Sequence, residues 1–232
     1  MGALKAFELE MVSLQNVSFR VDGFDPVLSH VDFELPLDQN IFVQSSNPFH
    51  AVHFLQILAG LQKPSSGCVM WNEKDIYNDE TAELNPHQFV SCYFENQRPH
   101  PKKTIFAILQ ESGLMANRIH EILEQFEFQS WEKAQFQQVS YEIQKTIQLI
   151  AVICKDPQML ILEDPALGLS ETAFLEILDL IQYGQRRGNL RHIYFTSHHP
   201  TALRHIDATT LHLEDGLLYL EEKLDTRKIY NF

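Results

Sequence analysis

The stretch that decides the fold is Met159-Leu-Ile-Leu-Glu-Asp-Pro-Ala-Leu-Gly-Leu-Ser170. Four apolar residues precede two carboxylates, Glu163 and Asp164, and Pro165 and Gly168 then break the pattern. A short apolar run of this kind predicts a strand that is buried on both faces. Ligands of open α/β sheets bind at the carboxyl ends of the strands, so the two acids are expected at a functional edge. A core strand that ends in two solvated acids is the plainer interpretation of the run alone.

The composition indicates a folded protein and excludes some classes of partner. The chain has 232 residues, 44% hydrophobic and 21% charged, with a formal net charge of −13. This length suffices for one sizeable α/β domain. The negative charge argues against a nucleic-acid partner, and the longest apolar runs fall short of the roughly 18 residues of a spanning helix, so no direct membrane insertion is expected. Three widely spaced cysteines favour reduced thiols in the cytoplasm: Cys68, Cys92 and Cys154.

Strand patterns and helix patterns alternate along the chain. Apolar alternation predicts two or three β segments between residues 11 and 35. A strand at 41–43 then runs into the polar loop Gln44-Ser-Ser-Asn-Pro48, and helical spacing follows up to Gly60. A strand, a short polar loop and a helix together form the geometry of a phosphate-binding site, because the helix N-terminus offers free N–H groups and a positive dipole end.

The rest of the chain continues the alternation around a helical insertion. Residues 104–155 contain one Gly and no Pro, and their periodicity predicts two to four helices, including a mostly buried helix over 142–153. Further strands are expected at 68–71, 89–94 and 192–196, helices at 171–183 and 201–205, and a hairpin around 214–216. These patterns predict an α/β fold with an N-terminal antiparallel β part and a small inserted helical lobe.

Several strings, in collinear order, resemble the nucleotide-binding domain of ABC-transporter ATPases over about residues 11–220. Beside the opening stretch they are Leu58-Ala-Gly-Leu61, Pro64-Ser-Ser-Gly67, Lys155-Asp-Pro157 and Tyr194-Phe-Thr-Ser-His198. The resemblance implies one ABC ATPase-like domain over 1–232 with a P-loop NTPase-like core. It places the core with its β part at about 11–95 and 155–232, and the helical lobe at about 96–154.

The phosphate loop of this family is replaced almost letter by letter. The family's Gly-Pro-Asn-Gly-Ser-Gly-Lys-Ser-Thr corresponds to residues 45–53, where Ser45 takes the first glycine position and only Asn47 is retained. The lysine position is Ala51, and the position of the Mg²⁺-binding hydroxyl is Val52. Glycines are needed there so that consecutive backbone N–H groups can wrap the phosphates, and Pro48 also removes one donor.

Other positions that the resemblance assigns are also altered. The glutamine after the 89–94 strand is Glu95, and the signature Leu-Ser-Gly-Gly-Gln becomes Val139-Ser-Tyr-Glu-Ile143, which keeps Ser140 alone at its place. A ring at Tyr141 and a carboxylate at Glu142 would oppose a triphosphate sterically and electrostatically.

The acids and the switch histidine are the best-kept positions. The family's Asp-Glu pair is reversed as Glu163-Asp164, and His198 matches the switch histidine, although a histidine that caps a strand end explains it equally well. A misplacement of roughly 1 Å can cost about a hundredfold in rate, so the reversal weakens the site.

The losses together predict a pseudo-ATPase, because phosphoryl transfer depends on positioning and charge stabilisation. ATP and Mg²⁺ binding is expected to be weak or absent, with no other metal site. The resemblance implies a scaffold or regulatory subunit that pairs with itself or with an ABC ATPase paralogue. It also implies that this subunit is cytoplasmic and reaches the membrane through an integral membrane protein.

The alternative is a divergent but active ATP-binding subunit of an ABC transporter that uses His50 or His53 in place of the lysine. Those two histidines lack a third metal ligand, and an ABC-like ATPase of DNA maintenance is disfavoured by the acidic charge.

Overall fold

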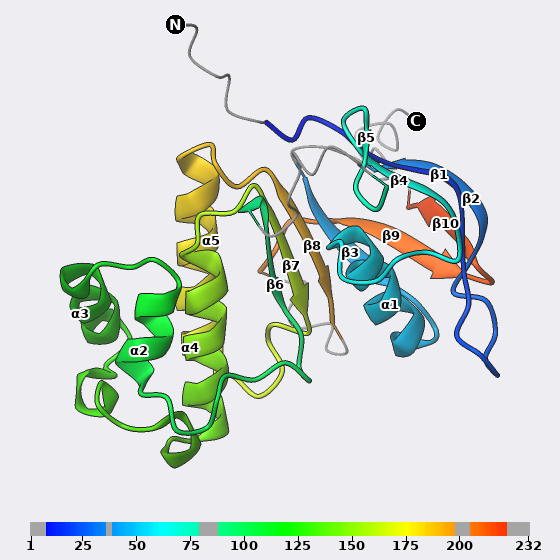
Figure 1. The fold of residues 1–232 in the computed structure, drawn as a ribbon. Helices are drawn as coiled ribbons and strands as arrows, with labels where there is room; N and C mark the ends of the chain where they lie inside the picture. The colour runs from blue at the N-terminus through cyan, green and yellow to red at the C-terminus, as the bar shows by residue number, and fades with distance from the viewer. Residues whose placement is uncertain (1–7, 36–38, 79–87, 198–204, 222–232) are drawn as a thin grey trace, which may run out of the picture.

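Two β-sheets organise the chain, and helices separate and cover them (Figure 1). The structure is a computed structural model that describes residues 8–35, 39–78, 88–197 and 205–221. The short helix predicted over 201–205 and the switch position His198 lie outside the described residues, apart from residue 205.

The first sheet is the predicted antiparallel β part. Its four strands run in the order β2-β1-β4-β5, with bounds Val12–Phe19 for β1, Leu28–Leu35 for β2, Ser66–Trp71 for β4 and Lys74–Asp75 for β5. The strand predicted from residue 68 begins two residues earlier, because Ser66 pairs with Ser18 of β1 beyond a bulge. Gly67 is required in that segment, since a Cβ there would lie 2.3 Å from the carbonyl oxygen of Asn16 and its φ is +82°.

The second sheet is parallel except at one edge. Its strand order is β10-β9-β3-β8-β7-β6, and only the pair β9 and β10 is antiparallel. The bounds are Asn40–Gln44 for β3, Val90–Tyr93 for β6, Met159–Glu163 for β7, His192–Thr196 for β8, Thr209–Glu214 for β9 and Leu217–Leu220 for β10. The opening stretch therefore supplies the strand between β6 and β8, as a doubly buried strand requires.

Helices lie on both faces of the parallel sheet (Figure 1). Helix α1 (Pro48–Leu58) lies between the two sheets, and α5 (Glu171–Arg186) covers the other face with α4 (Tyr141–Ile153). Helices α2 (Ile105–Glu111) and α3 (Ala116–Gln125) lie outside α4, with 3₁₀ turns at 129–131 and 136–138. Helix α5 extends past the predicted end at residue 183, and in its last turn Gln185 donates a hydrogen bond to Asn40 at 2.9 Å.

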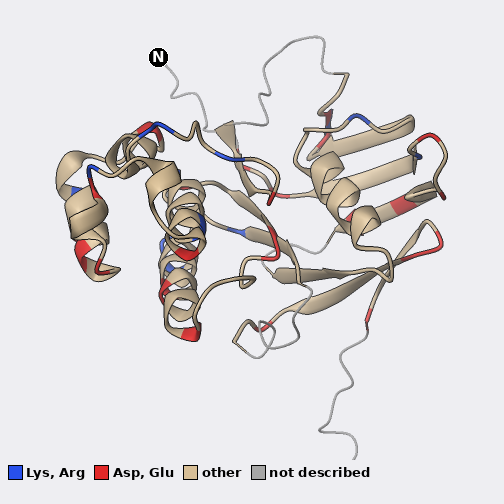
Figure 2. Ribbon diagram, turned by 90° about the horizontal axis from the view of Figure 1, so that it is seen from below, with Lys and Arg blue, Asp and Glu red and all other residues tan. Residues whose placement is uncertain are grey.

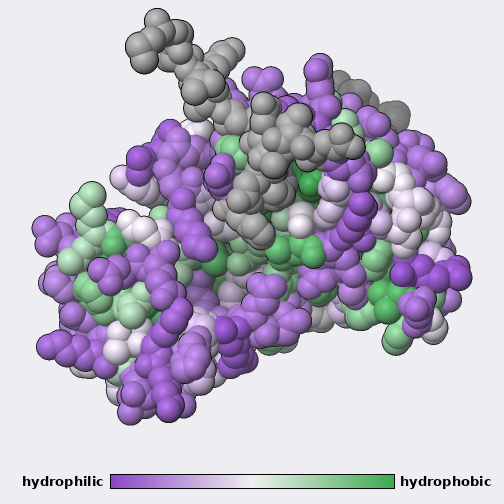
Figure 3. All heavy atoms as spheres, viewed as in Figure 1, coloured by the Kyte–Doolittle hydropathy of each residue, from purple (hydrophilic) through white to green (hydrophobic). Residues whose placement is uncertain are grey.

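Two hydrophobic cores follow from the alternation of side chains along the parallel strands. Met159 and Ile161 of β7 face the core that contains α1 and the antiparallel sheet. Leu160 and Leu162 face the core that contains α2 to α5. All four side chains are at most 1% exposed, so the carboxyl end of β7 is held firmly between both cores. Hydrophilic residues cover much of the face in Figure 3, with apolar side chains gathered near its centre and near α1.

Candidate functional site

The two acids of the opening stretch lie at the carboxyl end of β7. Asp164 is 1% exposed and adopts a positive φ of 44°, which turns the chain sharply after the strand. Its backbone N–H donates to the carbonyl oxygen of Thr196 in β8 at 3.0 Å, and the hydroxyl of Ser197 donates to its carboxylate at 3.3 Å. Glu163 is half-buried, and its carboxylate accepts the backbone N–H of Glu95 at 2.9 Å. The ends of β6 and β7 thus bring the side chains of Glu95, Glu163 and Asp164 to the same edge of the sheet.

A buried lysine supplies the positive charge at this edge. Lys145 of α4 has a fully buried side chain, and its ammonium is in contact with the carboxylate of Glu95 and donates to the carbonyl oxygen of Asp164 at 2.7 Å. The carboxylates of Glu163 and Asp164 also act on its charge. Burial lowers the pKa of Lys145, and the neighbouring acids oppose that shift only in part. Sequence reasoning missed this residue, although a lone lysine in a predicted buried helix was a usable signal.

Glu95 is the centre of a hydrogen-bond network between α4 and the parallel sheet. The hydroxyls of Tyr93 and Tyr141 each donate to its carboxylate at 2.9 Å, and the ammonium of Lys145 lies 5.3 Å from the Tyr93 ring centre. Burial raises the pKa of Glu95, but the hydrogen bond and charge of Lys145 and the two tyrosine hydroxyls outweigh it, so the net shift is downward. The acid at this position is therefore held as an anion by groups of the chain itself.

The two residues predicted at the signature glycine positions contact the segment between β7 and α5 of the same chain. A Cβ at Gly168 would lie 2.4 Å from the Tyr141 ring, so the ring is packed against bare backbone at a position where φ is +74°. The carboxylate of Glu142 accepts the backbone N–H of Ser170 at 2.8 Å, at the start of α5. Ser140 caps α4, because its hydroxyl accepts the backbone N–H of Ile143 at 3.3 Å.

The loop before α1 is also satisfied internally. The side chain of Asn47 accepts the backbone N–H of Phe49 at 3.1 Å and so caps the helix, and Pro48 occupies its first turn. The backbone N–H and the hydroxyl of Ser46 donate to the two oxygens of Glu214 at 2.7 and 2.6 Å. The hydroxyl of Ser46 lowers the pKa of Glu214, so a carboxylate of the chain holds donors at this helix N-terminus. Ser45 is half-buried beside them.

Ala51 and Val52, the positions predicted to correspond to the lysine and the hydroxyl of the phosphate loop, face the core. Ala51 is 3% exposed within the core around α1, and Val52 packs against that core. His53 stacks edge-on against Phe49, with ring centres 4.1 Å apart, and its ring contacts the amide of Gln62. Within the described parts of the chain, no group of three or more His, Cys, Asp or Glu residues is arranged to hold a metal ion.

Comparison with known proteins gives the family to which this architecture belongs. The model of the ABC transporter family matches residues 28–167, which is more than half of the chain. The chain belongs to the ABC transporter family. The match includes the loop before α1, Glu95, the segment 139–143 and both acids at the end of β7, so these segments lie within the family domain. His198, which follows the match, is outside the described residues.

Relatives and solved structures of the ABC transporter family agree with this assignment. The chain is 21% identical over 189 residues to the Fe(3+) ions import ATP-binding protein FbpC of Escherichia coli O157:H7, and 21% identical over 201 residues to the cobalt import ATP-binding protein CbiO of Salmonella typhimurium. The aligned regions span 80% and 81% of this chain, and 54% and 72% of those proteins. A third relative, an ABC-transporter ATP-binding protein of Onion yellows phytoplasma, is matched over only 36% of its length. The chain thus spans between about a third and about three quarters of the length of these three relatives.

The fold agrees with solved ABC cassettes over most of the chain. The structure of an ATP-binding subunit of an ABC transporter superposes with a TM-score of 0.76 at 16% identity, covering 95% of this chain and 93% of the other. A dimeric bacterial ABC transporter cassette superposes with a TM-score of 0.74 at 16% identity, covering 91% and 98%. No helix in the described ranges is long and apolar enough to cross a membrane.

Proposed function

We propose that this chain is a catalytically inactive member of the ABC transporter family that acts as a scaffold or regulator through its shape and contacts. The observation that carries the proposal is the ammonium of Lys145 among Glu95, Glu163 and Asp164. The resemblance implies that the corresponding residues of active family members lie beside Mg²⁺ and phosphate. Mg²⁺ demands near-octahedral oxygen ligands, and an ammonium that contacts the Glu95 carboxylate and the carbonyl oxygen of Asp164 competes with it by charge and by volume.

The loop before α1 supports the same proposal. A phosphate site needs free backbone N–H groups and a cation for the terminal phosphates. Here Asn47 caps the helix, Pro48 offers no donor, and the carboxylate of Glu214 holds the N–H of Ser46. A polyphosphate would have to displace that carboxylate and would meet like charge. Ala51, at the position of the family lysine, is 3% exposed within the hydrophobic core around α1, so a lysine there would place its charge in apolar surroundings.

The signature segment also supports the proposal that the chain is catalytically inactive. Tyr141 and Glu142 form contacts with Gly168 and Ser170 of the same chain. Their side chains occupy the helix start at which glycines would let a nucleotide on a second subunit approach. In a dimer of this family, each nucleotide site combines the phosphate loop of one subunit with the signature of the other. Because both segments are altered in this chain, pairing with an intact subunit would still leave one altered segment in each of the two sites.

The proposed binding partners are inferred from the family and not from particular residues of this chain. We propose that the whole of 1–232 forms one ABC ATPase-like domain that pairs with itself or with an ABC ATPase paralogue, and that docks an integral membrane protein from the cytoplasmic side. Two similar structures support this proposal, since one is a dimeric bacterial ABC transporter cassette and another is a CbiO1 protein that is part of the ABC transporter complex CbiONQ. Acidic residues are spread over both parts of the molecule in Figure 2, which agrees with a protein partner rather than a nucleic acid.

The proposal is tested by nucleotide binding and turnover on the purified chain. Equilibrium dialysis with Mg²⁺-ATP at millimolar concentration is expected to give no saturable binding, and phosphate release should match that of Asp164→Asn. An authentic ABC cassette measured in parallel provides the positive control. Saturable ATP binding, together with hydrolysis that is lost in Asp164→Asn, would overturn the proposal in favour of a divergent active ATPase.

A further inference from the structure

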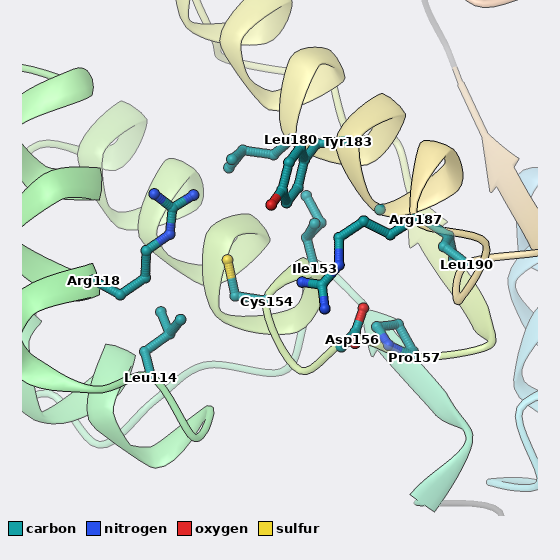
Figure 4. Close-up of a pocket in the computed structure, with 11 residues that line it drawn as sticks. Leu114, Arg118, Ile153, Cys154, Asp156, Pro157, Leu180, Tyr183, Arg187 and Leu190 are labelled. Carbon is teal, nitrogen blue, oxygen red and sulfur yellow. The ribbon is translucent and has the colours of Figure 1, made fainter.

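A pocket at the opposite end of the parallel strands lies apart from the candidate site (Figure 4). It has a volume of 420 Å³ and is formed between α3, the C-terminal ends of α4 and α5, and the turn before β7. Pro157 of that turn precedes β7, whereas Glu163 and Asp164 follow the strand's last residues, about 15 to 20 Å away at the usual rise of a strand. The volume falls within the usual range for small-molecule sites, roughly 300 to 1,000 Å³.

The inner walls of the pocket are apolar. Leu180 of α5, Ile153 of α4 and Leu190 after α5 are each at most 7% exposed, and Leu114 closes the side toward α3. These side chains belong to or pack against the core of the helical face, so the walls are set by the fold and not by a mobile surface loop. A ligand body that fits here must therefore be apolar.

Two guanidinium groups enter the pocket from opposite walls. Figure 4 shows Arg118 on the α3 side and Arg187 on the α5 side, with Ile153 of α4 and Cys154 just after it between them. Arg118 also pairs with Glu121 at 2.8 Å on the exposed face of α3. Arg187 lies over the Tyr183 ring at 5.8 Å from its centre and forms no ion pair with any residue that the structure describes. Two cations and one carboxylate line this pocket, a local excess of positive charge in a chain whose net charge is −13.

The remaining charges define where an anion would bind. Asp156 also lines the pocket; its carboxylate accepts a hydrogen bond from the side-chain amide of Asn189 and keeps its negative charge, so it would compete with a ligand anion for Arg187. The C-terminal ends of α4 and α5 reach the wall and carry partial negative charge, which attracts the guanidinium groups and repels an anion from the helix ends themselves. A ligand anion would therefore bind to the guanidinium groups, with its body against Leu180 and Leu190.

We propose that this pocket binds a small amphipathic carboxylate, one charged group on an apolar body, at a site separate from the candidate nucleotide site. A guanidinium presents a planar fork that matches a carboxylate, and the apolar walls take the body. This inference does not depend on whether the chain turns over ATP.

The proposal is tested with 2-naphthoate, 2-naphthamide and acetate, measured by calorimetric titration into the purified chain. The three probes separate the charge from the apolar body, since the amide is a neutral analogue of the same shape. We expect saturable 1:1 binding of 2-naphthoate, at least about tenfold weaker binding of 2-naphthamide, and none of acetate, because a hydrogen bond to a charged group is worth roughly tenfold or more. No saturable binding of 2-naphthoate, or equal binding of the amide, would overturn the proposal.

Variants then locate the site. Arg187→Gln should weaken 2-naphthoate at least about tenfold and leave 2-naphthamide unchanged, with Arg187→Lys intermediate because it keeps the charge without the fork. Gly184→Leu should abolish binding of both, since a Cβ at Gly184 meets only Leu190 at 3.5 Å and a longer side chain extends into the pocket. Arg20→Gln, outside this pocket, is the matched control. Unchanged naphthoate binding in folded Arg187→Gln and Gly184→Leu would place the ligand elsewhere and refute the assignment.

Discussion

The ammonium of Lys145 lies against the carboxylate of Glu95, 50 residues away in the sequence, and joins α4 to the carboxyl edge of the parallel sheet. Lys145 also donates to the carbonyl oxygen of Asp164 at 2.7 Å, so a single side chain contacts the segments that follow both β6 and β7. The side chain of Lys145 is fully buried and that of Glu95 is 23% exposed. The pair is therefore a structural bond between the helical part and the sheet.

Replacing Lys145 by Met should lower the free energy of unfolding by about 3 kcal/mol, because removal of one partner leaves carboxylates buried without compensation. Urea denaturation monitored by far-UV circular dichroism gives this value. Lys103→Met provides the control, since Lys103 pairs with Glu111 at 2.7 Å but both side chains are well exposed, and a loss below about 1 kcal/mol is expected. Equal losses in the two variants would contradict a structural role for the Lys145 pair.

The decrease of the unfolding free energy at acidic pH should depend on Glu95. Its pKa in the folded chain lies below the ordinary value of 4.5, so its carboxylate stabilises the fold above that pH and the contribution is lost as pH falls through the folded-state pKa. Wild type should exceed Glu95→Gln in unfolding free energy near pH 6, and the difference should shrink as the pH falls below about 4.5, as measured by urea titration at each pH. A difference that stays constant with pH would show that Lys145 does not hold Glu95 as an anion.

The packing of Tyr141 on Gly168 can be measured by a double-mutant cycle. Gly168→Ala should cost about 2 to 4 kcal/mol, from the left-handed φ and from the clash with the ring. In a Tyr141→Ala background the clash is absent, and only about 1 to 2 kcal/mol of backbone strain should remain. Chemical denaturation of the four proteins gives the coupling. Additive effects would mean that the ring does not lie over Gly168.

Restoring the family lysine should not restore the nucleotide site. Ala51 is 3% exposed in the core, so Ala51→Lys forces a cation into apolar surroundings and should cost more than about 2 kcal/mol without giving ATP binding. Ala116→Lys is the matched control, since Ala116 is an exposed alanine at the start of α3, and a change below about 1 kcal/mol is expected. Thermal unfolding and ATP dialysis on both variants decide the outcome. ATP binding by a stable Ala51→Lys protein would contradict the prediction.

The sequence was most informative where local pattern determines structure. The apolar run before Glu163, the polar loop before α1 and the periodicity of 142–153 predicted β7, the start of α1 and α4 to within a few residues. Contacts between distant segments were not predictable, because no sequence pattern around Lys145 or Glu214 indicates which distant residue its side chain contacts. The replaced motif positions were found by counting, but only the geometry shows that Tyr141, Glu142 and Asn47 satisfy groups of the chain itself.

The network around Glu95 has a consequence for how the chain would meet other proteins. Its members come from the sheet, the loop after β6 and helix α4, and each is bonded without any added molecule. The angle between the helical part and the sheet is thus preorganised, and a protein that docks across both would spend little of its binding energy on ordering them. Association with such a protein should therefore be rapid, and its rate should not depend on the nucleotide concentration, as expected of a rigid binding surface and not of an ATP-driven motor.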